Sequence, residues 1–200
     1  MKLYFAPQAC SMASHIVLRE LDLPFELVRV DNKAKKTATG EDYLAINPKG
    51  YVPALQLDDG QVLTEGPAIL QYLADLRPEA KLAPANGSFE RVRLQECLNF
   101  VSTEIHGCLG WLFNSQFPEE VKAQMKEKLF KRFKVLSATL EQQDYLLASG
   151  FSVADAYLFT VLRWTSYFAI DLNQWPALVQ FQARVDARPA VKAVLAVETA

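Results

Sequence analysis

Three stretches of the chain carry residue types that can do chemistry, and the first surrounds Cys10. This cysteine follows a predicted strand (residues 2–6) and a Pro7-Gln8-Ala9 break, at the start of a predicted helix over 11–21. Backbone N–H groups at a helix N-terminus stabilise an anion, so this position predicts a lowered pKa for the thiol. A buried and inert cysteine is the alternative. Cys10-Ser11-Met12-Ala13 lacks a second cysteine, which excludes a dithiol cycle within the motif but not a mixed disulfide with an external thiol.

The other two stretches lie at and beyond a second helix start. Glu65 and Gly66 precede a predicted helix whose N-terminus can bind an anion, although Glu65 could equally serve only the helix macrodipole. Farther along, Asn99, Thr103 and His106 are four and three residues apart, which places them on one face of a predicted helix. A lone helical histidine is otherwise more often structural. These two stretches are therefore candidate binding groups.

The remaining histidine and cysteines receive no chemical role. His15 lies on a mostly apolar helix and is predicted to be structural. Cys97 and Cys108 lie about 16 Å apart along a straight helix at 1.5 Å per residue, too far to bridge. The Cys and His residues form no cluster with metal-ligand spacing, so no metal site is expected.

Strand and helix patterns alternate over the first 80 residues. Residues 25–30 read as a second strand, which makes a parallel βαβ unit with the first strand and helix. A third strand at 52–57 turns through Asp58-Asp59-Gly60 into 62–63, and a helix follows from Thr64. Residues 32–40 are polar and are predicted to form a loop.

A cluster of Pro and Gly over residues 77–87 predicts a linker, and everything beyond it has helical patterns. We therefore expect an α/β domain over 1–80 and an all-helical domain over 87–200. Ser152-Val153-Ala154-Asp155 is a capping box, which predicts a role in specifying the fold. The predicted helices cover 88–113, 118–142, 151–169 (the buried centre), 176–187 and 189–197.

Composition narrows the class of protein. The 200 residues are 50% hydrophobic and 22% charged, which suits a chain with a sizeable core and not a disordered one. The net charge of -2 argues against a nucleic-acid partner. No run of 18 apolar residues and no signal-peptide pattern is present, so neither a membrane partner nor secretion is expected. Three cysteines without framework spacing fit a cytoplasmic protein with reduced thiols.

Five motifs occur in register along the whole chain. They are Cys10-Ser11, Asn47-Pro48-Lys49-Gly50-Tyr51-Val52-Pro53-Ala54-Leu55, Leu63-Thr64-Glu65-Gly66, Asn99 with Thr103-Glu104-Ile105-His106, and Phe151-Ser152-Val153-Ala154-Asp155. Together they make the chain resemble the glutathione S-transferase family, and the pairing of Cys10 with His106 resembles its bacterial beta class. The resemblance implies a thioredoxin-like N-terminal domain, a helical C-terminal domain and a homodimer.

The resemblance also implies a glutathione site in the first domain. A cis bond before Pro53 would leave the Val52 N–H and C=O to pair with the cysteinyl backbone of glutathione. The Gly66 N–H and the Glu65 carboxylate would take its γ-glutamyl end, although many family members have Ser in place of Gly66. Lys35 would pair with the glycine carboxylate of glutathione, with Lys33 and Lys36 as rivals and a solvated Lys cluster as the plain interpretation.

Catalytic roles follow from the same resemblance. Cys10 and His106 would lie at the glutathione sulfur, with Ser11 as a rival donor, and Glu104 would reach the ligand of the partner subunit. Aromatic residues would line a pocket for a small apolar electrophile: Trp111, Phe113, Phe117, Tyr167 and Phe168. The expected activity is conjugation of glutathione, the co-substrate, to such electrophiles in detoxification. A glutathione-dependent thiol transferase acting through Cys10 and a non-catalytic binding module remain the alternatives.

Overall fold

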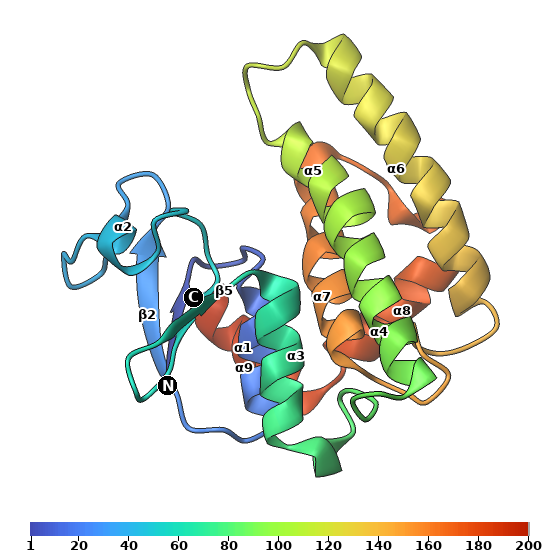
Figure 1. Ribbon diagram of the computed structural model, residues 1–200. Coiled ribbons are helices and arrows are strands. Elements are labelled where there is room, and N and C mark those ends of the chain that lie inside the picture. The colour runs from blue at the N-terminus through green and yellow to red at the C-terminus, as the bar shows by residue number, and fades with distance from the viewer. Residues whose placement is uncertain (200) are drawn as a thin grey trace. The chain divides into compact units, whose positions relative to one another are not determined.

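The computed structural model describes residues 1–199, and the chain divides into two compact units. The first unit contains residues 1–83 and the chain from Arg188 onward, and the second contains 84–187. Figure 1 shows the strands confined to the first unit, and the second contains only helices among its described elements. This is the predicted combination of a thioredoxin-like α/β domain with a helical domain.

The first unit is built on a five-stranded mixed sheet in the order β3-β2-β1-β4-β5. β1 and β2 are parallel, as the βαβ pattern predicts, and β4 pairs antiparallel with both β1 and β5. The elements are β1 (Lys2–Phe5), α1 (Met12–Glu20), β2 (Glu26–Asp31), β3 (Lys36–Thr37), α2 (Tyr43–Ile46), β4 (Ala54–Gln56), β5 (Val62–Thr64), α3 (Gly66–Leu76) and α9 (Pro189–Glu198).

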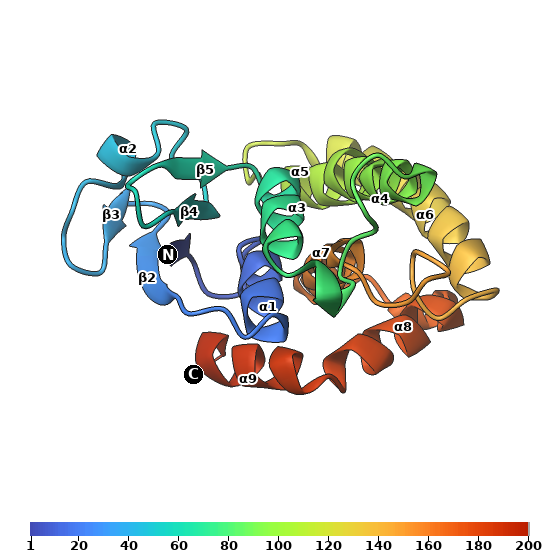
Figure 2. The same cartoon turned by 60° about the horizontal axis from the view of Figure 1, so that its bottom comes forward.

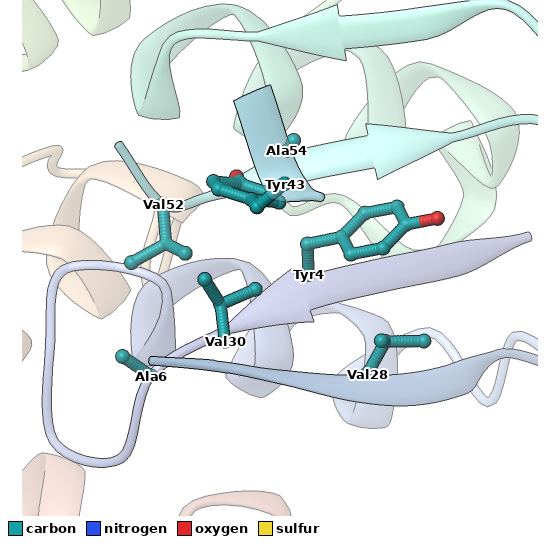
Figure 3. Close-up of a cluster of buried hydrophobic side chains, with 7 residues drawn as sticks. All are labelled: Tyr4, Ala6, Val28, Val30, Tyr43, Val52 and Ala54. Atoms are coloured by element: carbon teal, nitrogen blue, oxygen red, sulfur yellow. The ribbon is translucent and has the colours of Figure 1, made fainter. Parts of the chain in front are cut away.

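Strand alternation divides the core of this unit between the two faces of the sheet. Phe5 faces α1, where its ring lies 6.2 Å from that of His15. Tyr4 faces the opposite side and packs against Tyr43 of α2, with ring centroids 5.7 Å apart. Figure 3 shows the cluster on the α2 side: Tyr4, Ala6, Val28, Val30, Tyr43, Val52 and Ala54. Val52 thus anchors the loop before β4 in the core.

The C-terminal helix α9 packs along α1, as Figure 2 shows. Arg188, just before α9, makes a bidentate ion pair with Glu20 at the end of α1, with N–O distances of 2.6 and 2.9 Å. The sequence analysis places residues 189–197 in the helical domain, whereas they cluster with the first unit. Helical periodicity defines the apolar face of α9 but not the partner that covers it.

The second unit packs its helices around α7, whose ten residues are all buried. The predicted helix over 88–113 is interrupted by a π-helical segment, and the predicted helix over 151–169 tightens into a 3₁₀ segment after Leu162. The elements are α4 (Phe89–Phe100), the π segment (Val101–His106), α5 (Gly107–Leu112), α6 (Glu119–Leu140), α7 (Val153–Leu162), two 3₁₀ segments (Arg163–Phe168 and Leu172–Gln174) and α8 (Pro176–Asp186).

The capping box at the start of α7 forms as predicted. The fully buried Asp155 carboxylate accepts from the Ser152 N–H at 2.8 Å and from the Ser152 hydroxyl at 2.7 Å. Its other oxygen accepts from the Leu146 N–H at 2.7 Å, which the sequence did not indicate. Asp155 therefore holds the preceding loop as well as the helix start.

Candidate active site

Cys10 lies in the turn between β1 and α1, one residue before the N-cap of the helix. Its thiol is partly buried and donates to the Val52 carbonyl oxygen at 3.0 Å. Ala9 N–H donates to Ala6 O and Met12 N–H donates to Ala9 O, which fixes the turn on both sides of the cysteine. The strand, the helix and the loop before β4 together position this sulfur.

The predicted lowering of the Cys10 pKa is wrong for this structure. The N–H groups of Cys10 and Ser11 do favour the thiolate, as the helix-start argument requires, but burial outweighs them and raises the pKa to about 12. The negative charge of Glu65 acts in the same direction as burial. Cys10 is therefore a neutral thiol near pH 7.

Ser11 is fully buried and its hydroxyl is used within the turn. The oxygen lies 3.2 Å from both the N–H and the carbonyl oxygen of Ala6, accepting from the first and donating to the second. This corrects the prediction of Ser11 as a rival donor to the substrate sulfur. The helix-start position is right, but the side chain closes the turn instead.

The Val52–Pro53 peptide bond is cis, as the resemblance implies. The Val52 carbonyl is not free, because it accepts from Cys10. The Val52 N–H has no acceptor among residues 1–199, so it remains a donor for a ligand backbone. Tyr51 O, one residue earlier, accepts from the Tyr43 hydroxyl at 2.8 Å and from Asn47 Nδ2 at 2.7 Å, which holds the loop in place.

Lys35 is the lysine that the structure places beside this loop. Its ammonium donates to Gly50 O at 2.7 Å and lies 5.3 Å from the centre of the Tyr51 ring. Gly50 has φ of +69°, and a Cβ there would lie 3.1 Å from Leu44, so glycine suits this turn. Lys33 and Lys36 are exposed. Within residues 1–199 their side chains make no hydrogen bond or ion pair with the loop, which favours Lys35 among the three.

Glu65 and Gly66 form the start of α3. Glu65 has φ of +72°, a conformation that non-glycine residues adopt rarely and usually where function requires it. Its exposed carboxylate pairs with Lys49 at 2.6 Å, an ion pair of small energetic weight. Pro67 removes the next backbone donor, so Gly66 contributes the first unpaired N–H of the helix. The start of α3 thus offers an unpaired N–H, which an anion site would require.

In the second unit, the candidate residues fall at the π segment. Asn99 and Thr103 are exposed, and Thr103 Oγ1 donates to the Asn99 carbonyl oxygen at 3.0 Å. The Gly107 N–H bonds to Ser102 O, five residues back, which adds a residue to the turn. The predicted shared face assumed regular α-helical spacing, which holds up to Phe100 but not through the π segment that contains Thr103 and His106. Such π insertions occur frequently at functional sites.

His106 ends the π segment and is partly buried among aromatic rings. Its Nδ1 shares a hydrogen bond with the Tyr157 hydroxyl, and its ring lies 4.9 Å from that of Trp164. Burial lowers the pKa of His106 to about 4, so the imidazole is neutral near pH 7. When Tyr157 donates this bond, the Nε2–H is left to donate to a ligand.

Glu104 is paired inside its own chain, whereas the resemblance assigned it to the ligand of the partner subunit. Its carboxylate bonds to Arg132 Nε and lies 3.5 Å from Lys128 Nζ, both on α6. These two cations lower the pKa of Glu104. The contact ties the π segment to α6 and gives Glu104 a role in holding that segment.

Aromatic side chains extend from His106 along the second unit. Trp164 contacts both His106 and Phe113, and Phe113 also packs against Phe168 with centroids 4.6 Å apart. Phe113 and Tyr167 are about half exposed, at 51% and 55%. Trp111, 52% exposed, stacks on Phe117 at 4.7 Å. The predicted aromatic residues are thus partly on the surface, where they can contact a ligand.

Residues 1–199 contain no group of three His, Cys, Asp or Glu side chains arranged to hold a metal ion. Within the same residues, no helix combines the length and apolarity needed to cross a bilayer. All three cysteines are free thiols.

Some residues at the site could not be found from sequence. Lys49, which pairs with Glu65, stands in the motif Asn47-Pro48-Lys49-Gly50, but its partner is 16 residues away. Tyr157, the partner of His106, lies 51 residues away on α7. Both contacts depend on the packing of distant elements, for which the local sequence carries no signal.

Comparisons with known proteins agree with this architecture. Residues 9–76 match the glutathione S-transferase N-terminal domain and residues 94–189 match the C-terminal domain. Glutathione S-transferase GstA of Escherichia coli O157:H7 is 43% identical over 198 residues, covering 99% of this chain and 98% of that protein.

Solved structures are similarly close. A ternary complex of BphK, a bacterial enzyme of this type, superposes with a TM-score of 0.98 at 54% identity and full coverage of both chains. A sphingomonad glutathione S-transferase complexed with glutathione gives 0.97 at 45% identity, covering 100% of this chain and 99% of that one. The chain belongs to the glutathione S-transferase family and is an enzyme of that family, with a bacterial beta-class protein among its structural neighbours.

Proposed function

We propose that this enzyme conjugates the thiolate of glutathione to small apolar electrophiles and that Cys10 acts as a neutral S–H donor. The single observation that carries the mechanism is the state of Cys10: its thiol is bonded to Val52 O and burial raises its pKa to about 12. A thiol in that state is a poor nucleophile, since the thiolate is the attacking form. The attacking sulfur is then that of glutathione itself.

The groups around the loop before β4 suit each part of glutathione. The Val52 N–H, in the loop just before β4, fits the cysteinyl backbone carbonyl. The Gly66 N–H, at the positive end of α3, fits the γ-glutamyl carboxylate. The Glu65 carboxylate fits the adjacent ammonium in exchange for Lys49, and Lys35 fits the glycine carboxylate. The glutathione complex of the sphingomonad relative supports the same ligand.

In the second unit we propose that His106 donates from its neutral imidazole to the glutathione sulfur, with Asn99 and Thr103 as polar neighbours. The aromatic residues that continue from His106 through Trp164 to Phe113 suit the apolar electrophile. Stabilising a developing thiolate with preorganised neutral donors is electrostatic catalysis, and holding both substrates contributes the rest.

Two assays test this proposal. Wild-type protein should be retained on immobilised glutathione and should turn over a chromogenic aryl halide. Retention without turnover of any aryl halide would favour the non-catalytic binding module. Turnover of a mixed glutathione disulfide in place of the halide would favour the thiol transferase.

We also propose that the enzyme is a homodimer and works in the cytoplasm. The three free thiols suit a reducing compartment. Phe89 and Val92, on one side of α4, are 66% and 53% exposed, which leaves apolar surface for a second copy to cover. Sedimentation at micromolar concentration should show a species of twice 22.5 kDa, and a monomer alone would refute the dimer.

A further inference from the structure

A buried carboxylate at the far end of the chain reaches the turn that carries Cys10. Glu198 is the last residue of α9 and its side chain is fully buried. Its Oε2 accepts from the Gln8 N–H at 2.8 Å, and its Oε1 lies 2.9 Å from His15 Nδ1. Both contacts lie within the first unit, and they join residues that are 190 and 183 positions apart in the sequence.

These two contacts fall on either side of Cys10. Gln8 lies two residues before the cysteine, in the turn after β1, and His15 lies five residues after it on α1. Gln8 has φ of +59°, a left-handed conformation that costs a non-glycine residue free energy and persists only where its surroundings enforce it. The Glu198 oxygen on its N–H is one such constraint. Glu198 therefore fixes the position from which Cys10 reaches Val52 O.

Burying this pair is expensive for stability alone. A buried carboxylate pays a large desolvation cost, and a well-packed apolar pair is often as stable. His15 Nε2, at the other side of the ring, is buried with no hydrogen-bond partner among residues 1–199. The ring nevertheless stays in place between Phe5 and Phe25, at 6.2 and 5.5 Å. Of the two ring nitrogens of His15, only Nδ1, which faces Glu198, has a hydrogen-bond partner among the described residues.

We propose that Glu198 is a positioning residue for the thiolate site, holding the Cys10 turn through Gln8 and α1 through His15. The proposal rests on the proposed function, since it names the part of the fold that places the Cys10 donor. The sequence predicts only a packing role for His15, on a mostly apolar helix, and indicates no role for Glu198. The contacts make both of them supports of the catalytic turn.

The chain contains a matched control for this proposal. Arg188, which caps α9, also joins that helix to Glu20 of α1, with N–O distances of 2.6 and 2.9 Å, but Glu20 lies at the C-terminal end of α1 and the Cys10 turn precedes its N-terminal end. Glu20→Gln therefore weakens the same helix pair without reaching the turn. Any effect of Glu198 variants that Glu20→Gln does not share belongs to the turn.

The experiment compares Glu198→Leu, Glu198→Gln and Glu20→Gln with wild type. Glu198→Leu keeps the volume but leaves the Gln8 N–H without its acceptor. We expect its kcat for aryl conjugation to fall by about fivefold to tenfold, because a misplaced Cys10 donor costs no more than the loss of that donor. Glu198→Gln can accept from Gln8 and donate to the other tautomer of His15, so it should stay within about threefold of wild type. Glu20→Gln should lower only the denaturation midpoint.

A second readout does not depend on glutathione chemistry. Alkylation of Cys10 by iodoacetamide, followed by peptide mass spectrometry, reports how tightly the turn encloses the thiol. Glu198→Leu should speed this alkylation by about tenfold, because local opening exposes the sulfur. Where Glu198→Leu does not fold, Glu198→Asp replaces it, since its shorter side chain cannot reach both partners.

The outcomes separate the two proposals. An inactive wild type whose Cys10 alkylation still responds to Glu198→Leu would refute the proposed function and leave the role of Glu198 intact. An active wild type with unchanged kcat and unchanged alkylation in a folded Glu198→Leu or Glu198→Asp protein would overturn the role of Glu198. An equal loss of kcat in Glu20→Gln would also overturn it.

Discussion

Cys10 and His106, one in each unit, are kept neutral by the same physical cause acting on opposite charges. Burial penalises the charged form of any group, so it raises the pKa of the Cys10 thiol to about 12 and lowers the pKa of the His106 imidazole to about 4. Near pH 7 neither group carries a charge. Each unit therefore holds a neutral donor near pH 7, which is the form that the proposed conjugation by glutathione itself requires.

The two units differ in the groups that would contact a ligand, which are mainly backbone groups in the first unit and side chains in the second. The first unit relies on backbone geometry: the cis bond at Val52–Pro53, the positive φ of Glu65 and the open N-terminus of α3. The second relies on side chains placed by a π segment that Glu104 ties to α6. Outside the Cys10 turn and the residues that support it, substitutions in the first unit should mainly change the KM for glutathione. Substitutions in the second unit should mainly change kcat or stability.

The largest effect should come from the helix start that supports the second unit. Asp155→Ala leaves the buried N–H groups of Ser152 and Leu146 without acceptors, and each such loss costs about 1–3 kcal/mol. We expect the free energy of unfolding to fall by about 3 kcal/mol, measured by chemical denaturation. Ser152→Ala should cost less, about 0.5–2 kcal/mol. Unchanged midpoints in both variants would contradict the capping role.

His106→Phe keeps the ring packing with Trp164 but removes the nitrogen donor. We expect kcat for aryl conjugation to fall by about 10-fold to 10²-fold, below the 10²–10³ of an ideal donor, with little change in the KM for glutathione. Tyr157→Phe keeps the imidazole and removes only its orienting hydroxyl, so its loss should be smaller. A raised KM with unchanged kcat in His106→Phe would break the contrast between the two units.

His106 also predicts a pH dependence of stability. Its folded pKa of about 4 lies below the usual 6.5, so between these values the unfolded chain binds the extra proton. The stability contributed by the neutral form is thus present above pH 6.5 and is lost as the pH falls toward 4. The difference in unfolding free energy between wild type and His106→Phe should follow that course. A difference independent of pH from 4 to 7 would contradict the buried neutral imidazole.

The smallest expected effect is a change in the KM for glutathione when a hydroxyl is added at Gly66. A Cβ at Gly66 meets nothing within 4 Å and φ there is not positive, so Gly66→Ser should fit without strain. The new hydroxyl can add one hydrogen bond to the γ-glutamyl carboxylate, worth about 0.5–1.5 kcal/mol. The KM for glutathione should fall by about threefold to tenfold while kcat stays the same. An increase in KM would argue against ligand binding at the start of α3.

The features of the fold that the sequence predicted are those determined by residues close together in the chain. The βαβ unit, the hairpin at Gly60, the linker and the Ser152–Asp155 box all depend on neighbouring residues. The four-residue α2 and two-residue β3 carry too few residues for a period. The π segment was missed because the sequence retains an α-helical pattern on both sides of the extra residue.

The sequence suggested candidate residues for the site but not their physical state. Position at a helix start suggested a lowered Cys10 pKa, but the size of the burial penalty depends on the packing of Val52 and its neighbours. The sequence does not distinguish Ser11 from an active-site donor, because its hydrogen bond to the Ala6 carbonyl oxygen depends on how the turn folds. The contact of Glu198 with Gln8 joins opposite ends of the chain.

Paired assays of Cys10→Ala test the central claim most directly. If the attacking sulfur belongs to glutathione, aryl conjugation should fall by less than about tenfold, because a thiol is a weak donor and its loss removes one contact among several. Any turnover of a mixed glutathione disulfide that runs through the Cys10 sulfur should be abolished, since that route needs an enzyme thiol. Complete loss of conjugation in a folded Cys10→Ala protein that still binds immobilised glutathione would contradict the account and make Cys10 obligatory.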